Sequence, residues 1–259
     1  MGGSVPWDLP ATRCLFMKPL ENKVCVITGA NQGLGKGMAR RFAQSGARLA
    51  LCARNVLKLE SFAAELRSSG NEVFAKPVDV SQEDQVDDFF DHVRAEWGRV
   101  DVLVNNAGAF DGGRVDTVSL EAWNNVVGAC LTGTFLCTRR AFEMMRERGG
   151  GRILNIGSIS AQRPRENSAP YAAAKFGVWG LTQATALDGR PYGITCSCLH
   201  PGNVLVERRQ ESGLTSDTEP MMTIETLAEV AHTMVTLPPE VNMLEAIVMP
   251  TQQLYLGRG

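Results

Sequence analysis

The sequence lacks the features that mark membrane, secreted and nucleic-acid-binding proteins. No apolar run reaches the roughly 20 residues that a membrane-spanning helix needs. The first 16 residues do not have the basic start and apolar stretch of a signal peptide. Neither sign of charge is in excess, because 26 Lys and Arg residues balance 28 Asp and Glu residues. Neither a nucleic acid nor an acidic membrane is therefore expected as a partner.

Paired cysteines are also missing. The chain has seven cysteines, an odd number, and no CxxC pair occurs among them. Several lie in apolar, strand-like runs, where a thiol packs as a small hydrophobic group. Cys196 and Cys198 alternate along one such run without a His or Cys partner at ligand spacing. We therefore expect reduced thiols in a cytoplasmic protein and no metal site.

What the sequence does contain is a regular alternation of short β-rich runs and longer helical runs. Strands are predicted at Val24–Thr28, Arg48–Ala53, Glu72–Lys76, Val100–Val104, Arg152–Ile156, Ile194–Leu199 and Ala246–Met249. Helices are predicted at Gly33–Gly46, Val56–Ser69, Ser119–Arg148, Tyr171–Leu187 and Ile224–Leu237, and another runs from a Ser81 cap, with Asp84 in the capping box, to near Trp97.

The strands are nearly continuous apolar runs, as strands buried on both faces should be. The alternation predicts an α/β fold, a Rossmann-type doubly wound parallel sheet in a single domain. Residues 1–16, which include Pro6 and Pro10, are expected to form a flexible N-terminal extension. The domain itself is expected to span residues 17–259, with a substrate loop near residues 202–222.

A glycine-rich turn follows the first strand and opens the first helix. It reads Thr28-Gly29-Ala30-Asn31-Gln32-Gly33-Leu34-Gly35. Gly29 permits a tight turn, Gly33 lets the backbone approach a pyrophosphate, and Gly35 lets helix and sheet pack closely. The start of the helix offers free N–H groups and a positive dipole to phosphates. Glycines also serve ordinary turns, but this position between strand and helix favours nucleotide binding.

Four further motifs occur in a fixed order along the chain. Asn105-Asn106-Ala107-Gly108 follows the fourth strand, Tyr171 and Lys175 form a YxxxK pattern, Ser158 lies 13 positions before Tyr171, and Pro201-Gly202 follows the sixth strand. Together with TGxxxGxG, this set resembles the short-chain dehydrogenase/reductase family. The resemblance spans roughly residues 23–206 and implies a Rossmann fold, a nicotinamide cofactor, and a homodimer or homotetramer built on the Ser119–Arg148 and Tyr171–Leu187 helices.

The end of the second strand bears on which nicotinamide cofactor is used. An NAD-preferring site usually has Asp or Glu here for the ribose hydroxyls. Ala53 holds that position, and Arg54 after it could grip a 2′-phosphate, with Asn31 adding a bond. Arg54 could instead be a solvated loop residue. We expect NADP(H), with NADPH preferred over NADH.

The resemblance implies the rest of the cofactor site. Asp79 and Val80 should flank the adenine, and Asn106, Ala107 and Gly108 should line the nucleotide path. The remaining expected contacts are Gln32 and Leu34 in the turn, Tyr171 and Lys175 on their helix, and Pro201, Gly202 and Val204 after the sixth strand.

Ser158, Tyr171 and Lys175 are the expected catalytic group. Tyr171 and Lys175 stand four residues apart, so they share one face of a helix. A free tyrosine has a pKa of about 10, and a nearby ammonium favours its phenolate form. Tyr171 is expected to exchange a proton with a small carbonyl or alcohol substrate, Lys175 to hold the ribose, and Ser158 to orient the substrate oxygen. Singly, each could be an ordinary surface or capping residue, and Ser160 is a nearby rival to Ser158.

Two departures from the family pattern keep another function open. Cys130 stands where the family usually has an Asn that helps to hold a relay water, and a thiol is a weaker hydrogen-bonding group. Val206 replaces the family's Thr that contacts the nicotinamide carboxamide. The alternative is a nucleotide-binding regulatory or scaffold protein with weak or lost turnover. Arg163 and Arg165, between Ser158 and Tyr171, could meet an anionic substrate or could simply be solvated.

Overall fold

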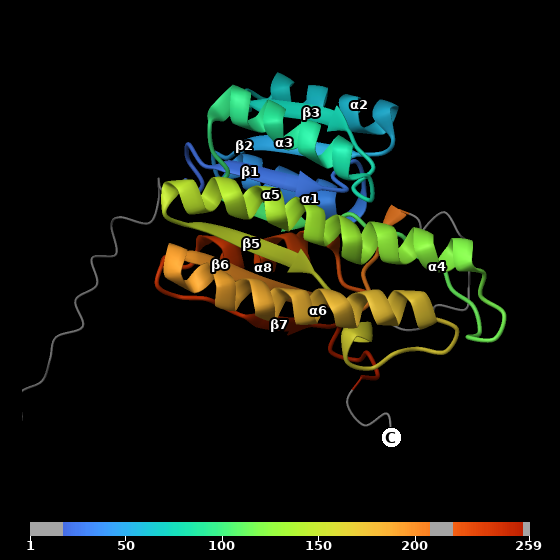
Figure 1. The fold of residues 1–259 in the computed structure, drawn as a ribbon. Helices are drawn as coiled ribbons and strands as arrows, with labels where there is room; N and C mark the ends of the chain where they lie inside the picture. The colour runs from blue at the N-terminus through green and yellow to red at the C-terminus, as the bar shows by residue number, and fades with distance from the viewer. Residues whose placement is uncertain (1–17, 208–219, 256–259) are drawn as a thin grey trace, which may run out of the picture.

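An all-parallel, seven-stranded sheet runs through the middle of the molecule (Figure 1). The computed structural model describes residues 18–207 and 220–255. The strand order is β3-β2-β1-β4-β5-β6-β7. The strands are β1 (Val24–Thr28), β2 (Arg48–Ala53), β3 (Val73–Pro77), β4 (Val102–Asn105), β5 (Gly151–Ile156), β6 (Ile194–Pro201) and β7 (Glu245–Val248). The prediction of a Rossmann-type doubly wound sheet in one domain is confirmed.

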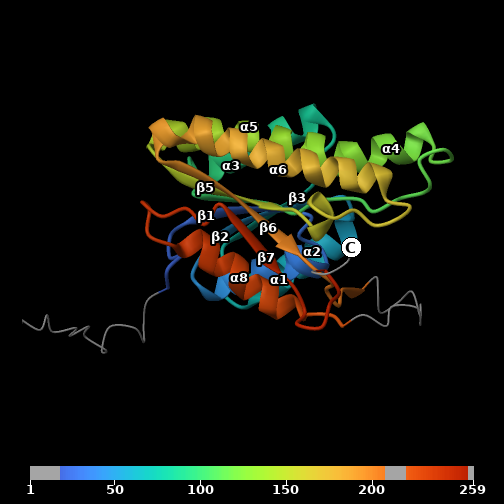
Figure 2. The ribbon, with the colours of Figure 1, turned by 90° about the horizontal axis from the view of Figure 1, so that it is seen from below.

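Helices cover both faces of the sheet, which gives three layers (Figure 2). One face carries α1 (Gly33–Gln44), α2 (Val56–Ser68) and α8 (Ile224–Thr236). The other carries α3 (Glu83–Trp97), α4 (Leu120–Val127), α5 (Gly133–Arg148) and α6 (Ala169–Gly189). Three short helical segments complete the described fold: η1 (Gly128–Thr132), η2 (Ile159–Ala161) and η3 (Arg190–Tyr192).

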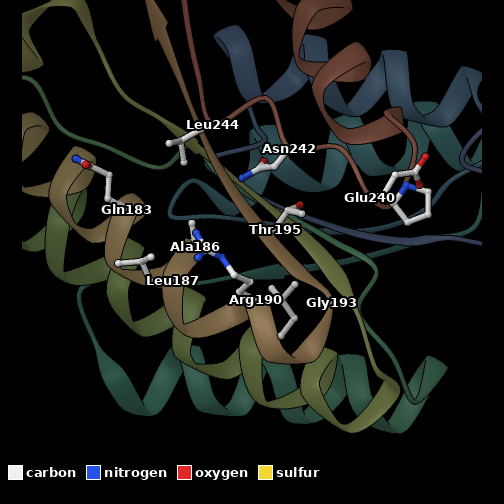
Figure 3. Close-up of a pocket in the computed structure, with 11 residues that line it drawn as sticks. Gln183, Ala186, Leu187, Arg190, Gly193, Thr195, Glu240, Asn242 and Leu244 are labelled. Atoms are coloured by element: carbon white, nitrogen blue, oxygen red, sulfur yellow. The ribbon is translucent and has the colours of Figure 1, made fainter.

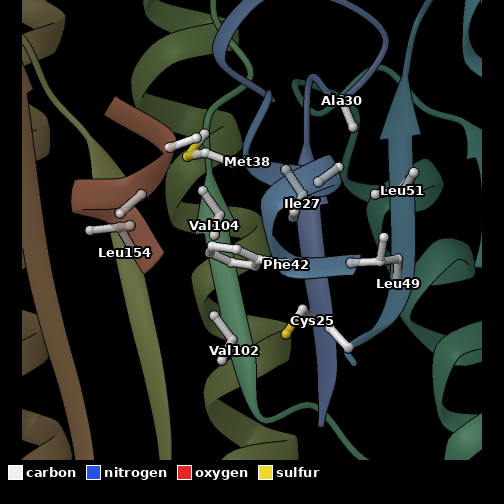
Figure 4. Close-up of a cluster of buried hydrophobic side chains, with 14 of the residues drawn as sticks. Cys25, Ile27, Ala30, Met38, Phe42, Leu49, Leu51, Val102, Val104 and Leu154 are labelled. Atoms are coloured by element: carbon white, nitrogen blue, oxygen red, sulfur yellow. The ribbon is translucent and has the colours of Figure 1, made fainter. Parts of the chain in front are cut away.

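Each face of the sheet has its own hydrophobic core. On the α1 side, Phe42 and Met38 pack against Ile27, Leu49 and Val104 of the strands (Figure 4). On the α3 and α5 side, the core includes Phe89, Phe90, Met144 and Met145. Burying one such side chain stabilises the fold by about 1.5–3 kcal/mol. The two cores explain why the strands read as continuous apolar runs, because both faces are covered.

The predicted element bounds differ from the observed ones by at most two residues at most ends, and two local predictions are wrong. Gln82, not Ser81, precedes α3, and the Ser81 hydroxyl donates to Asp79 Oδ1 at 2.8 Å instead of capping the helix. The predicted helix over Ser119–Arg148 is interrupted by the π-helical turn η1, where the hydroxyl of Thr134 donates to the Cys130 carbonyl at 2.8 Å. Such π turns are frequent at functional sites.

A buried polar network fixes the carboxyl ends of the central strands. Asn105 Nδ2 donates to Asn155 Oδ1 at 2.8 Å and to Thr138 Oγ1 at 2.9 Å. Asn155 Nδ2 in turn donates to Thr182 Oγ1 at 2.9 Å. The network joins β4, β5, α5 and α6, and buried hydrogen bonds of this kind rigidify the core. It sets the positions of the loops that leave β4 and β5.

Candidate active site

The predicted site residues gather at the carboxyl edge of the sheet. Because all strands are parallel, the loops after β1, β4, β5 and β6 leave from the same edge. The glycine-rich turn follows β1, Asn106–Gly108 follows β4, Ser158 follows β5, and Gly202 follows β6. In an open α/β sheet this edge is where ligands bind.

The glycines of the turn are required by close backbone contacts. Gly29 has a φ of +64°, a conformation that side chains disfavour. A Cβ on Gly35 would lie 2.3 Å from the Gly29 carbonyl oxygen, so only glycine fits there. Gln32 precedes α1 without a capping side-chain bond, and the first turn has no acidic residue. The N-terminus of α1 is therefore a donor set suited to an anion.

The segment after β6 lies against this turn. The Gly33 N–H donates to Glu207 Oε2 at 3.0 Å, so a carboxylate already sits on the N–H that would meet a phosphate. A Cβ on Gly33 would lie 3.5 Å from Val206 Cγ1, which places Val206 beside the turn. A bound pyrophosphate would compete with Glu207 for the Gly33 N–H. The chemistry of these donors fits a dinucleotide phosphate, and the contact was not foreseen from the sequence.

A clamp between β1 and β4 holds the turn in place. Thr28 Oγ1 accepts the backbone N–H groups of Asn106 at 3.0 Å and Ala107 at 2.9 Å. Asn106 Nδ2 donates back to the carbonyls of Thr28 at 3.0 Å and Gly29 at 3.1 Å. Asn106 was predicted to touch the nucleotide, whereas its described contacts are with the turn. The role of Thr28 was missed, although it opens the TGxxxGxG motif.

Arg54 follows β2 on the same edge as the turn. It is exposed and forms no ion pair or hydrogen bond with any residue of 18–207 or 220–255. Ala53, the last residue of β2, is buried and carries no carboxylate. Asn31 is half-buried, Gln32 is exposed, and Leu34 packs against the core.

Asp79 and Val80 lie at the start of the loop that leads to α3. Asp79 Oδ1 accepts the Ser81 N–H at 3.0 Å as well as the Ser81 hydroxyl. Val80 is buried, and a Cβ on Gly133 would lie 2.5 Å from its Cγ2. The loop is thus fixed by its own hydrogen bonds and by contact with α5.

Lys175 and Tyr171 occupy one face of α6. Lys175 is only 6% exposed, and its Nζ donates to the Ile156 carbonyl at 2.7 Å. Nζ lies 5.6 Å from the centroid of the half-buried Tyr171 ring. Burial alone would lower the pKa of Lys175, but interactions with Tyr171, Cys130 and Cys198 outweigh burial and raise the pKa above its ordinary value. Lys175 therefore stays an ammonium at neutral pH.

Ser158 caps the short segment η2 at the end of β5. Its Oγ accepts the Ser160 N–H at 3.1 Å, and the residue is 8% exposed. Because Oγ accepts this bond, the hydroxyl proton remains available to another acceptor. Ser160, the rival, is also buried, but it serves here as the backbone donor to Ser158.

The two departures from the family pattern have different surroundings. The Cys130 thiol is 1% exposed and donates to the Ala109 carbonyl at 3.3 Å. A Cβ on Gly108 would lie 3.1 Å from Cys130 Sγ, so the thiol supports the loop after β4. The Phe110 ring in that loop meets Tyr171 edge-on at 5.1 Å between centroids. Val206, as described above, packs beside Gly33.

The loop after β6 has a buried donor without a partner. Gln253 Oε1 accepts the Asn203 N–H at 2.8 Å, while its Nε2 is buried with no hydrogen bond to the described residues. A Cβ on Gly202 would lie 2.2 Å from Gln253 Oε1, so a side chain at this position would displace the Gln253 amide. Val204 is buried and pairs with Met222. Such an orphan amide fits a polar group bound nearby.

The cavity found elsewhere in the described structure lies away from the predicted site. A cavity of about 480 Å³ is lined by α6, η3 and the segment before β7, at the amino end of β6 (Figure 3). That end of the sheet is opposite the predicted site.

Within residues 18–207 and 220–255, no cluster of three His, Cys, Asp or Glu side chains could hold a metal ion. No described helix is long and apolar enough to cross a membrane.

The fold and the glycine-rich turn define a dinucleotide-binding α/β protein, and comparison with known proteins gives its family. The short chain dehydrogenase family matches residues 23–217. A 3-oxoacyl-[acyl-carrier-protein] reductase from Synechocystis sp. is 33% identical over 192 residues, 74% of this chain and 78% of that one. The chain belongs to the short-chain dehydrogenase/reductase family and is an oxidoreductase of that family.

Solved structures agree with this assignment. An actinorhodin polyketide ketoreductase with NADPH superposes with a TM-score of 0.82 at 31% identity, covering 90% of this chain and 98% of that chain. A metagenomic short-chain oxidoreductase in complex with NADP gives a TM-score of 0.79 at 30% identity, with 90% and 99% covered. A nicotinamide cofactor is therefore supported for this chain as well.

We predict that Thr28→Val opens the clamp between β1 and β4, whereas Thr28→Ser keeps it. Valine has a similar shape but leaves the N–H groups of Asn106 and Ala107 without their acceptor, which should lower the free energy of unfolding by about 1–3 kcal/mol. NADPH affinity should fall with it. Urea unfolding and calorimetric titration of both variants measure these effects. Equal stability and affinity for the two variants would show that the hydroxyl does not hold the turn.

Proposed function

We propose that this protein transfers a hydride between NADP(H) and a small carbonyl or alcohol substrate, with Tyr171 as the general acid and base. The observation that carries the proposal is the buried Lys175 ammonium, held by the Ile156 carbonyl and placed 5.6 Å from the Tyr171 ring centroid. An ammonium in this position stabilises the negative charge that develops on the Tyr171 oxygen while its proton is exchanged with the substrate. The intact group of Ser158, Tyr171 and Lys175 does not favour the regulatory alternative.

In the proposed mechanism, the nicotinamide, when bound, supplies or accepts the hydride. The Tyr171 hydroxyl donates its proton to the carbonyl oxygen during reduction, or takes the alcohol proton during oxidation. The Ser158 hydroxyl, whose Oγ already accepts the Ser160 N–H, donates to the same substrate oxygen and stabilises its developing charge. Lys175 Nζ uses one N–H on Ile156, which leaves two for the cofactor ribose.

We propose the following contacts for the cofactor, beginning at the glycine-rich turn. The N–H groups at the start of α1 would hold the pyrophosphate once Glu207 leaves Gly33. Asp79 and Val80 would flank the adenine, and Asn106 would act chiefly by holding the turn. The remaining proposed contacts are Gly29, Asn31, Gln32, Leu34, Gly35, Ala107, Gly108, Tyr171, Lys175, Pro201, Gly202 and Val204.

The loop after β6 is proposed to cover the substrate, as predicted for residues 202–222. Its residues 208–219 lie outside the described part of the chain, as does the predicted extension at 1–16. The described residues 202–207 run from β6 to the glycine-rich turn. This path supports a loop that lies next to both proposed ligands.

A cytoplasmic location is proposed from the thiols. Six cysteines lie in the described residues, and all six are free and buried. Burial raises the pKa of the Cys52 thiol to about 12, so the thiol stays protonated and unreactive. Such thiols suit a reducing compartment.

We predict that NADPH binds more tightly than NADH and that Arg54→Ala removes most of the difference. The exposed guanidinium has no described partner and would pair with the 2′-phosphate, so its loss should weaken NADPH binding about 10- to 100-fold. Calorimetric titration with both cofactors measures this. Arg148→Ala, an exposed arginine at the far end of α5, is the control. Equal affinities for NADPH and NADH in the wild type would contradict the preference.

We predict that Tyr171→Phe loses about 100-fold or more of the turnover with NADPH and leaves NADPH affinity nearly unchanged. The phenol supplies the proton, whereas the ring alone packs against Phe110. A panel of small ketones and aldehydes, followed by the loss of NADPH absorbance, identifies a substrate for the wild type first. If the variant keeps more than about a tenth of the wild-type rate, Tyr171 is not the general acid and base. Tight NADPH binding without turnover on any carbonyl would favour the regulatory alternative.

We propose that the chain assembles into a homodimer or homotetramer through α4, α5 and α6. These helices expose several large apolar side chains, namely Leu120, Trp123, Phe135, Phe176 and Leu187. Phe135 and Phe176 are each nearly half exposed, at 46% and 47%. Exposed apolar patches of this kind mark association surfaces. These helices correspond to the two predicted helices, Ser119–Arg148 and Tyr171–Leu187, on which the assembly was expected to be built.

Replacing Phe135 and Phe176 together by Glu should shift the protein to monomers, because buried charge without a partner opposes association. Analytical ultracentrifugation at micromolar concentration measures the mass. Leu57→Glu on α2, an 84% exposed position on the other face, is the control and should leave the assembly intact. A wild type that sediments as a monomer would refute the assembly.

A further inference from the structure

His200 is a buried histidine that the proposed mechanism does not use. It is the penultimate residue of β6 and is 0% exposed. Its Nδ1 lies 2.8 Å from the backbone oxygen of Ser158 and 3.3 Å from the backbone nitrogen of the same residue. The Ser158 N–H points at Nδ1 as a donor in the longer contact, but two unprotonated acceptors would repel each other at the shorter distance. Because a carbonyl oxygen can only accept, we assign the ring proton to Nδ1 and the 2.8 Å contact as Nδ1–H donating to Ser158. His200 therefore binds directly to the main chain of a proposed catalytic residue.

Residues of α6 and β7 surround the ring. The Trp179 ring of α6 meets the imidazole edge-on at 5.6 Å between centroids. Nε2 is buried without a hydrogen-bond partner among the described residues, and the nearest carboxylate oxygen, Glu245 Oε1 of β7, lies 3.4 Å away. Glu245 in turn accepts from Gln162 Nε2, and the Tyr255 hydroxyl donates to Gln162 Oε1 at 2.5 Å. The hydrogen bond to Ser158 and the contact with Trp179 are therefore the interactions that orient the ring.

The neutral form of the ring fits this arrangement. Burial lowers the pKa of His200 below its ordinary value, although the Ser158 carbonyl and Glu245 act in the opposite direction, while Lys175 adds to the lowering. At neutral pH the imidazole thus carries one proton. The 2.8 Å contact places that proton on Nδ1, toward Ser158.

Packing at Gly157 shows how closely the ring approaches β5. A Cβ on Gly157 would lie 2.6 Å from His200 Nδ1 and 2.7 Å from Cys198 Sγ. A histidine that only filled space would be costly here, because a buried polar ring needs its hydrogen bond. An apolar side chain could fill the same space without one. The hydrogen bond to Ser158 is thus the feature that distinguishes His200 from a core residue.

We propose that His200 is a positioning residue for Ser158: its Nδ1–H holds the Ser158 carbonyl and so aims the Ser158 hydroxyl at the substrate oxygen. The proposal rests on the proposed function of Ser158. The peptide of Ser158 is also the cap of η2, so a shift of its carbonyl would move Oγ relative to Tyr171. A misplacement of about 1 Å at a reacting group can cost about 100-fold in rate.

Two variants separate the hydrogen bond from the bulk of the ring. His200→Asn places an amide donor where Nδ1 lies and removes the outer part of the ring. His200→Gln places its amide near the Nε2 position and loses the donor to Ser158. We expect His200→Asn to keep kcat within about threefold and His200→Gln to lose about 10- to 100-fold. NADPH affinity should change little in either. Equal losses in the two variants would overturn the proposal and leave a packing role.

A double-mutant cycle with Ser158→Ala tests whether His200 acts through Ser158. If it does, His200→Gln should cost nothing further in the Ser158→Ala background, because the hydroxyl that it aims is gone. Single-turnover rates with the substrate found for the wild type measure the small residual activity. Multiplicative losses in the double variant would contradict the proposal.

A spectroscopic readout keeps this test independent of turnover. Ser158-Ile159 is the only Ser-Ile dipeptide in the sequence. Labelling serine with ¹³C at the carbonyl and isoleucine with ¹⁵N therefore gives one carbonyl-to-amide correlation, which reports the Ser158 carbonyl. We expect its shift to be near wild type in His200→Asn and clearly moved in His200→Gln. An unmoved signal in His200→Gln overturns the hydrogen bond, whereas absence of turnover in the wild type with the expected shifts counts against the proposed function alone.

Discussion

The structure depends on the contact between the ends of β1 and β4. The sheet is parallel throughout, so its strands deliver their last residues to a single edge, where backbone groups no longer have ladder partners. The hydroxyl oxygen of Thr28 accepts two of these N–H groups, and the amide nitrogen of Asn106 donates to two carbonyls. One reciprocal set of bonds thus fixes the turn that precedes α1. The glycines can then approach a ligand without the loop collapsing.

A second anchor ties the chemistry to this frame. Lys175 reaches from α6 to the Ile156 carbonyl at the end of β5, while Asn155 in the same strand bonds to Thr182 of α6. Both contacts are buried, so water screens them little. The ammonium near Tyr171 is therefore anchored to β5, the strand that Ser158 follows. In our proposal, the nicotinamide site lies where α6, β5 and the glycine-rich turn converge. The Tyr171 hydroxyl and the Ser158 hydroxyl meet the substrate oxygen at the same place.

The order of the strands and helices could be predicted from the sequence, because the spacing of apolar residues and the positions of glycines are local properties. The strands are apolar on both faces, and Gly98, with a φ of +65°, ends α3 as a glycine there should. Prediction from the sequence failed where two hydrogen-bond partners compete for the same side chain. Ser81 could cap α3 or bond to Asp79, and only the fold shows that Asp79 takes the hydroxyl. The π turn at Cys130 is likewise invisible in a pattern of apolar spacing.

The contacts that join distant segments could not be predicted. Glu207 bonds to Gly33 across 174 positions, and His200 bonds to Ser158 across 42. Nothing in the local residue pattern marks either side chain, since a glutamate in a polar loop and a histidine before Pro-Gly have ordinary solvated or packed interpretations. Motif spacing found Ser158, Tyr171 and Lys175 because the family constrains them together. Their supporting residues became visible only from burial and distance.

The position of the cofactor is the central claim, and a crystal structure of the protein with NADP⁺ tests it most directly. The account predicts that the pyrophosphate accepts the Gly33 N–H in place of Glu207, that the 2′-phosphate contacts Arg54, and that the nicotinamide lies beside Tyr171 with the ribose on Lys175. A dinucleotide bound away from the glycine-rich turn, or a Glu207 carboxylate that stays on Gly33 with NADP⁺ bound, would contradict it.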